Sequence, residues 1–145
     1  MKYQEILSRL PYSEPFLFVN ELTEISEDHV QGNYRFSEDA FFYRGHFRGN
    51  PVTPGVILTE CMAQIGLVCL GIFLLNSAED QLTTPKIAMT STEIEFLEPV
   101  FPGERVEVNS EKIYFRFNKL KCRTEMRNST GNIVCKGIIS GMITA

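Results

Sequence analysis

The chain has 145 residues, of which 43% are hydrophobic and 22% are charged, and its formal net charge is −4. These totals predict one globular domain over residues 1–145, which is long enough to bury roughly two-thirds of its unfolded surface. The negative charge argues against nucleic acid as the main partner, because nucleic-acid binding usually needs a basic face. The opening stretch MKYQEILSRL lacks the apolar core and cleavage site of a signal peptide, so we expect a cytoplasmic protein.

The four cysteines show no pattern that indicates a disulfide framework or a metal site. They have no C-x-x-C spacing, and no histidine stands at a zinc-ligand distance from them. We therefore expect reduced thiols, in keeping with the cytoplasm, and no metal bound by these cysteines. The residues concerned are Cys61, Cys69, Cys122 and Cys135.

The N-terminal third predicts one short helix and two strands. Apolar residues at helical spacing favour a helix over residues 3–10, and Pro11 ends it. Strands are expected over residues 16–25 and 29–36, on either side of the turn-like sequence SEDH. His29, which belongs to this polar turn, is expected to be exposed to solvent.

A long apolar helix is expected over residues 54–75. Pro54 suits the first helical position, since its missing N–H would have no partner there, and Thr53 is a reasonable N-cap. Asn76, Ser77 and an acidic loop should end the helix. Its length would suit a membrane span, but polar residues that include Glu60 make that reading poor. The sequence instead favours a helix buried at the centre of the domain.

The remainder of the chain is predicted to be β-structure. Consecutive strands separated by turns need no crossover helices, which favours an antiparallel sheet. One buried helix followed by such strands is typical of an α+β fold, with the sheet wrapped around the helix. The expected strands cover residues 87–96, 106–117, 120–126 and 133–143.

A possible base and a possible acid lie close together in the sequence. His46 is one of only two histidines, and an imidazole with an ordinary pKa is largely a free base at neutral pH. Glu60 lies on the apolar helix, where desolvation should raise the pKa of its carboxyl group and keep it protonated. Together they would form a general base and a general acid.

The start of the helix could stabilise negative charge between these two groups. The backbone N–H groups of Gly55 and Val56 have no intrahelical partners, and Gly55 lets a carbonyl group approach closely. This set fits proton abstraction next to a carbonyl with loss of a hydroxyl group. From the residues alone, His46 could equally be an ordinary loop histidine, and Glu60 could form a structural ion pair.

Residues 45–64 carry the pattern G-H-F-x-G-N-P-V-x-P-G-V-x-x-x-E-x-x-A-Q. This pattern resembles the signature of the 3-hydroxyacyl-acyl-carrier-protein dehydratases of the hot-dog fold. LPYSEPFLFVNEL and IEFLEPVFPGERV are also similar to segments of that family, so the resemblance covers most of the chain. It implies a hot-dog fold, in which an antiparallel sheet wraps a long central helix.

The resemblance also implies roles for individual residues. His46 matches the catalytic histidine, Glu60 the catalytic acid, and Gly55 the glycine whose N–H polarises the thioester carbonyl. Gln64 matches a glutamine that supports the acid. With a glutamate at position 60, the resemblance implies dehydration without isomerisation, by a reaction that needs neither a metal nor an organic cofactor. Val56, Phe42 and Phe47 are further candidates for substrate contact.

Two partners follow from the same resemblance. In the family, the histidine and the acid of one site come from different subunits, which implies a homodimer and leaves open further assembly into a hexamer. The substrate is attached to acyl carrier protein, which is strongly acidic, so we expect a basic rim around the site. The candidates for that rim are Arg44, Arg48 and Lys86, with Lys119 and Lys121 as further possibilities.

Three departures from the family pattern leave alternatives open. Arg48 stands where proline is usual, Asn20 replaces an aspartate, and KIAMTS at residues 86–91 lacks an aromatic residue that often gates the acyl tunnel. The departures at Arg48 and in KIAMTS keep open a non-catalytic partner subunit of a dehydratase. A hot-dog thioesterase, which also uses an acidic residue on the central helix, is a second alternative. A hydratase acting on coenzyme A thioesters is disfavoured, because its D-x-N-x-x-H pattern is absent. Acyl chain length and pathway are left open by the sequence.

Overall fold

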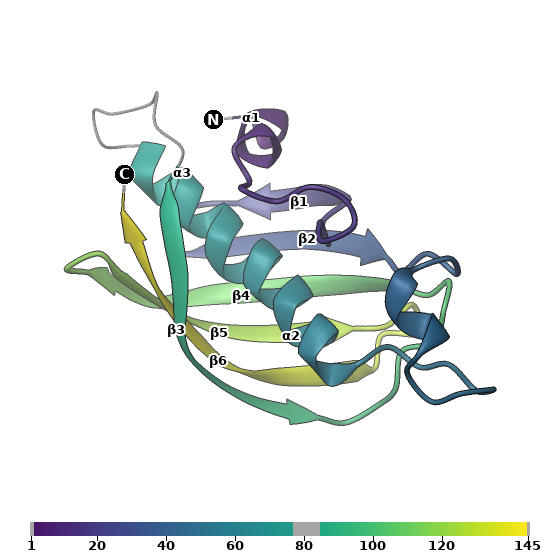
Figure 1. Cartoon of the computed structure of the whole chain (residues 1–145). Helices are drawn as coiled ribbons and strands as arrows, with labels where there is room; N and C mark the ends of the chain where they lie inside the picture. Colours follow the sequence, from purple (N-terminus) through teal and green to yellow (C-terminus); the bar gives the residue numbers. More distant parts are fainter. Residues whose placement is uncertain (1, 77–84, 145) are drawn as a thin grey trace.

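A computed structural model describes residues 2–76 and 85–144, which form an antiparallel sheet curved around one long helix (Figure 1). This arrangement confirms the predicted α+β class. Ser77 and the acidic loop expected after the helix lie outside the described residues. The elements are α1 (Tyr3–Ser8), β1 (Glu21–Ile25), β2 (His29–Arg35), the 3-10 helix η1 (Phe41–Arg44), α2 (Gly55–Ala63), the π-helix η2 (Gln64–Cys69), α3 (Leu70–Asn76), β3 (Lys86–Phe96), β4 (Arg105–Arg116), β5 (Lys119–Arg127) and β6 (Ile133–Thr144).

The six strands lie in the order β1-β2-β4-β5-β6-β3. Strand β3 follows the helix in the chain but takes the far edge, where it pairs antiparallel with the last strand. It is eleven residues long and exposed along most of its length. The other edge strand, β1, has only five residues and a bulge next to Leu22. A long exposed edge offers unpaired backbone groups to another chain, whereas a short irregular edge does not.

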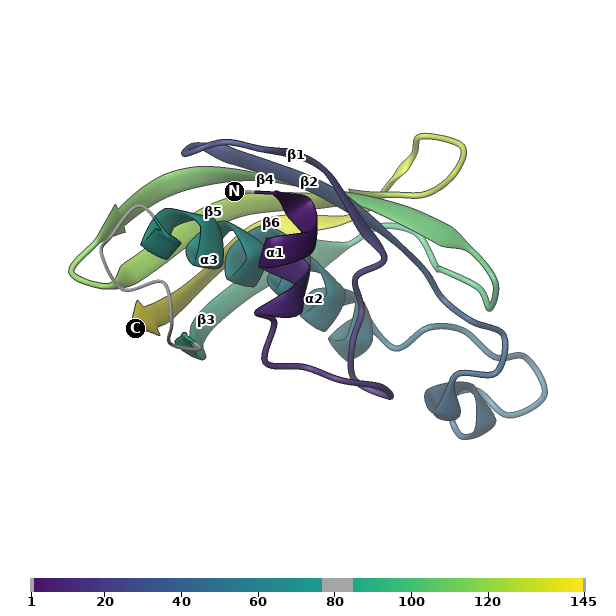
Figure 2. The same ribbon diagram turned by 90° about the horizontal axis from the view of Figure 1, so that it is seen from above.

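Helices α2, η2 and α3 form one continuous rod, Gly55–Asn76, which lies along the concave face of the sheet (Figure 2). The rod is long and apolar enough to cross a membrane, but 78% of its most apolar window is buried inside this fold. The sequence prediction of a buried central helix is confirmed. Gly66 allows the close approach, because a Cβ atom there would lie 3.0 Å from the side chains of Ser110 and Thr124.

Two local predictions were wrong. The first strand begins at Glu21 rather than Phe16, because the backbone N–H of Phe18 donates to the side chain of Gln64 instead of to a neighbouring strand. The helix begins at Gly55 with Pro54 as its N-cap. The hydroxyl group of Thr53 does not cap the helix and bonds to Tyr43 instead.

The predictions for the cysteines and for His29 can also be compared with the structure. The four cysteines are buried free thiols, as expected. His29 was expected to be exposed, but its side chain is only 30% exposed at the start of β2. Its Nδ1 atom lies 3.5 Å from a carboxylate oxygen of Glu24.

Candidate active site

The predicted acid lies on the second turn of α2, half-buried against the core. Gln64, one helical turn further on, is fully buried, and its Nε2 group donates a hydrogen bond of 2.9 Å to Oε2 of Glu60. Burial raises the pKa of Glu60, and the hydrogen bond from Gln64 only partly opposes that effect. A carboxyl group with a raised pKa keeps its proton to higher pH, which is what a general acid requires.

Gln64 is itself fixed by the segment that precedes β1. Its Oε1 atom accepts a 2.8 Å hydrogen bond from the N–H of Phe18, and its Nε2 group donates to the carbonyl oxygen of Phe16 at 3.1 Å. The N–H of Phe18 needs an acceptor, so the amide group has only one satisfactory orientation. The donor face of Gln64 is therefore turned toward Glu60.

Tyr12 is a neighbour of the acid that the sequence did not reveal. Burial, and to a lesser extent the charge of Glu60, raises the pKa of the Tyr12 phenol to about 12. The phenol therefore stays neutral at physiological pH, close enough to Glu60 to be affected by its charge. Tyr12 precedes the Pro-Phe-Leu segment, and no spacing rule links that region to the helix.

The predicted base lies in an irregular loop between η1 and α2. Nδ1 of His46 lies 2.7 Å from the carbonyl oxygen of Val52. A carbonyl group can only accept, so Nδ1 carries the hydrogen and Nε2 presents a free lone pair. The ring of Phe47 stacks on the imidazole at 4.5 Å, although Phe47 has a positive φ of 60° and is 64% exposed.

The start of α2 provides the predicted donors. The carbonyl oxygen of Pro54 accepts the first helical hydrogen bonds, from Ile57 and Leu58. In residues 2–76 and 85–144, the N–H groups of Gly55 and Val56 donate no hydrogen bond. A hollow between this helix start and β3 is lined by Gly55, Val56, Thr59, Met89, Thr90, Ser91, Thr92, Ile94 and Phe96. The helix donors therefore border a space where a ligand could lie.

Phe42 is a further predicted substrate contact. Phe42 is half-buried in a cluster of edge-to-face aromatic rings with Phe18, Phe36, Phe41 and Tyr43. Within the described part of the chain, no hydrogen bond or ion pair joins His46 to Glu60. One chain therefore holds the base and the acid in separate surroundings.

The predicted basic residues also fall into two groups. Arg44, the last residue of η1, and Arg48, on the loop that carries His46, are both exposed. Lys86 begins β3 and pairs with Thr144, at the opposite end of the sheet from that loop (Figure 1). Lys119 and Lys121 lie on β5 near the β4–β5 hairpin, at the same end as Lys86. Within one chain, Lys86 is therefore separate from the two arginines.

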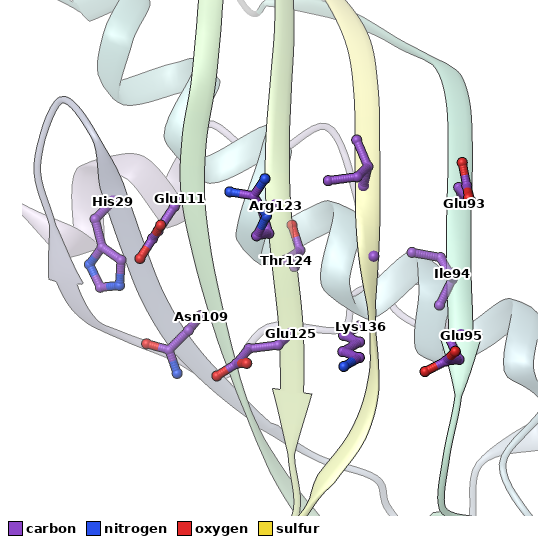
Figure 3. Close-up of a pocket in the computed structure, with 12 residues that line it drawn as sticks. His29, Glu93, Ile94, Glu95, Asn109, Glu111, Arg123, Thr124, Glu125 and Lys136 are labelled. Carbon is purple, nitrogen blue, oxygen red and sulfur yellow. The ribbon is translucent and has the colours of Figure 1, made fainter.

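A second hollow lies on the face of the sheet away from the helix (Figure 3). Charged side chains of alternating sign surround it, among them Glu95, Glu125 and Lys136. None of the predicted site residues lines it. Its exposed, ionic character differs from the half-buried surroundings of Glu60, so we place the candidate active site at the helix start.

Comparisons with known proteins identify the family of the chain. The model of the FabA-like domain matches residues 10–137. The chain is 34% identical over 135 residues to a 3-hydroxyacyl-[acyl-carrier-protein] dehydratase FabZ of Caldicellulosiruptor saccharolyticus, covering 91% of each protein. It is 33% identical over 143 residues to the FabZ of Clostridium perfringens, covering 96% of each. The chain belongs to the FabA-like family, which includes these dehydratases.

Solved structures support the fold. The dehydratase heterocomplex ApeI:P from Xenorhabdus doucetiae aligns with a TM-score of 0.78 and 14% identity, over 99% of this chain and 93% of that chain. A thioesterase from Streptococcus pneumoniae with coenzyme A aligns with a TM-score of 0.63 and 15% identity, over 86% and 85%. At such low identities these likenesses establish the hot-dog fold and no particular reaction.

Proposed function

We propose that this protein removes water from 3-hydroxyacyl thioesters carried by acyl carrier protein and forms trans-2-enoyl thioesters. The reaction would serve fatty-acid or polyene and polyketide-type biosynthesis in the cytoplasm. The observation that carries the proposal is the state of Glu60, a half-buried carboxyl group with a raised pKa, held by the amide of Gln64. The curated FabZ relatives are named for this reaction.

Each step of the reaction has a suitable group. Nε2 of His46 takes the α-proton of the substrate, because Nδ1 is already committed to Val52. Negative charge then develops on the thioester oxygen, where the N–H groups of Gly55 and Val56 can stabilise it. The C–O bond at the β-carbon breaks, and the hydroxyl group leaves as water with the proton of Glu60. Protonated His46 and ionised Glu60 are reset by net proton transfer through solvent.

The active form is a dimer in which His46 of one subunit works with Glu60 of the other. Apolar side chains are exposed along the β3 edge and the nearby helix start, including Val56 at 76%, Phe96 at 50% and Met89 at 42%. Exposed apolar surface beside a long free strand edge favours pairing with a second chain. Such a pairing can bring together a base and an acid that do not interact within one chain.

Complementation between two inactive variants tests both the reaction and the shared site. His46→Ala and Glu60→Gln homodimers should each lose nearly all dehydration of 3-hydroxybutyryl carrier protein. A heterodimer of the two variants contains one complete site if the sites are shared, and it should recover about half of the wild-type rate per dimer. Unchanged activity of the His46→Ala homodimer contradicts the reaction proposal, whereas an inactive heterodimer contradicts the shared site.

Hydrolysis of the thioester is the main competing reaction, because thioesterases share the fold. A thioesterase that used Glu60 as a base or nucleophile would need an ionised carboxylate, and burial disfavours that form. The same incubation distinguishes the two reactions. A dehydratase yields the enoyl thioester with no free thiol, whereas a thioesterase releases carrier protein with a free thiol.

The carrier protein would dock through basic side chains near the entrance to the site. Arg44, at the end of η1, and Arg48, on the His46 loop, are exposed, while Lys86, Lys119 and Lys121 lie at the other end of the sheet. In a dimer with antiparallel edges, the far end of one subunit lies toward the loop of the other. Both basic groups could then border one entrance.

A further inference from the structure

The loop that carries His46 has little regular structure of its own. Its turns include Gly49 with a φ of 80° and Phe47 with a φ of 60°. Only a few backbone hydrogen bonds hold it, such as the one from His46 N–H to the carbonyl oxygen of Phe42 at 3.1 Å. Something further must keep the imidazole in place, because a misplacement of about 1 Å can cost about a hundredfold in rate.

A buried pair of hydroxyl groups joins the two ends of this loop. The phenol oxygen of Tyr43 lies 2.5 Å from Oγ1 of Thr53. Tyr43, in η1, is 7% exposed, and Thr53, just before α2, is 4% exposed. Burial raises the pKa of the Tyr43 phenol, so it remains a neutral O–H group. Neither hydroxyl group can easily exchange its partner for water in such a position.

The peptide group between Val52 and Thr53 connects this pair to the base. The N–H of Thr53 donates to the carbonyl oxygen of Val100 at 2.8 Å, and Val100 is fully buried. The carbonyl oxygen of the same peptide group accepts the Nδ1–H of His46 at 2.7 Å. Because a trans peptide is planar with its N–H and C=O pointing in opposite directions, fixing Thr53 also fixes the acceptor for His46.

We propose that the Tyr43–Thr53 hydroxyl pair is a clamp that sets the position and the tautomer of His46 through the Val52 carbonyl group. Tyr43 and Thr53 are then positioning residues, since neither touches the reacting atoms. Without the clamp, the Val52–Thr53 peptide keeps its hydrogen bond to Val100 but loses the support of the Thr53 side chain, so its carbonyl group can tilt and weaken the contact with Nδ1. Part of the imidazole population would then carry its hydrogen on Nε2, where it cannot act as the base.

Kinetics provide the first test, made on the intact dimer. Tyr43→Phe and Thr53→Val should each lower kcat about tenfold and leave KM within about twofold. The double variant should lose little more than either single variant, because both substitutions remove one interaction. Thr53→Ser retains a hydroxyl group and should restore most of the rate.

The core offers a matched control for these substitutions. Ser110 and Thr124 form another buried hydroxyl pair, with their oxygens 3.1 Å apart, on strands β4 and β5. Ser110 keeps a hydrogen bond to the carbonyl oxygen of Gly66 when Thr124 is replaced. Thr124→Val therefore removes the same kind of contact with the same substitution as Thr53→Val, and kcat should change by less than about twofold.

A spectroscopic readout separates positioning from stability. The chain has two histidines, so a long-range ¹H–¹⁵N spectrum contains the imidazole signals of His46 and His29 alone. Wild-type His46 should show the Nδ1–H tautomer, and its two ¹⁵N shifts should move toward each other in Tyr43→Phe and Thr53→Val. The His29 signals should not move, and Thr124→Val should leave both histidines unchanged.

The results of these experiments test the Tyr43–Thr53 clamp independently of the proposed reaction. A kcat within twofold of wild type in Thr53→Val, or a loss of kcat with unmoved His46 signals, would overturn the clamp. If Tyr43→Phe does not fold, Thr53→Val and Thr53→Ser still decide the question. The kinetic readout rests on the proposed dehydratase activity, whereas the spectrum does not. An inactive wild-type protein with the expected spectral changes would therefore refute the reaction and leave the clamp supported.

Discussion

The two groups of the candidate active site are held in different ways. Glu60 lies on a helix embedded in the core and accepts a hydrogen bond from Gln64, which makes two more hydrogen bonds to the segment before β1. His46 lies on an irregular loop, where a hydrogen bond to Val52 and stacking against Phe47 orient its ring. The hydrogen bonds that position Glu60 therefore also hold the helix to the segment before β1, whereas the position of His46 depends on a few local contacts. Substitutions near the acid should affect stability, and those near the base should mainly affect rate.

The largest effect is expected when the acid itself is changed. Glu60→Gln should lower kcat by about 10²- to 10⁴-fold, the usual contribution of a general acid. The exposed substitution Glu5→Gln on α1 serves as the control and should not change the rate. Full activity of Glu60→Gln would contradict the assignment of the acid.

The same variant tests the pH dependence of stability. Because burial raises the pKa of Glu60, the folded protein binds this proton more tightly than the unfolded chain. The contribution of Glu60 to stability is therefore fully present below the unfolded pKa and is lost as pH rises through the folded pKa. As pH rises from about 4 to about 8, the Tm of Glu60→Gln should therefore increase relative to the Tm of wild type, because only wild type loses this contribution. Thermal unfolding at several pH values measures the difference. An opposite slope would indicate that Glu60 is ionised in the folded protein.

The next largest effect concerns the support of the acid. Gln64→Leu preserves side-chain volume but leaves the buried N–H of Phe18 without its acceptor. The free energy of unfolding should fall by about 1–3 kcal/mol, because unsatisfied buried polar groups are costly. Urea unfolding measures this loss. A change below about 0.5 kcal/mol would show that the acid is not coupled to the fold in this way.

The smallest effect is expected at the surface of the loop. Arg48→Glu should lower kcat/KM for carrier-bound substrate about three- to tenfold at low salt, with no change in thermal stability. The same acyl group on free pantetheine is the control, since it lacks the acidic protein and should react at the wild-type rate. Lys119→Glu makes the same test at the other end of the sheet. Loss of rate with both substrates would place Arg48 in the chemistry rather than in docking.

Much of this protein could be predicted from local sequence. A long apolar run that starts at Pro54 predicted the central helix, and segments separated by turns predicted strands β2 to β6 close to their observed ends. The combination of His46, Gly55, Glu60 and Gln64 was proposed from one continuous pattern over residues 45–64 that resembles a family signature. The start of β1 was missed because the backbone at Phe18 hydrogen-bonds to a side chain 46 residues away. Short-range patterns contain no information about such a contact.

By itself, the sequence determined the fold class, the proposed base and acid, and the apolar surroundings that raise the pKa of Glu60. Only the tertiary structure decided which face of Gln64 meets the acid, where β3 lies, and how the loop is held. Thr53 illustrates the reason, since its sequence position favours an N-cap while its hydroxyl group bonds to Tyr43. Local chemistry determines what a side chain can do, and packing selects which partner it meets.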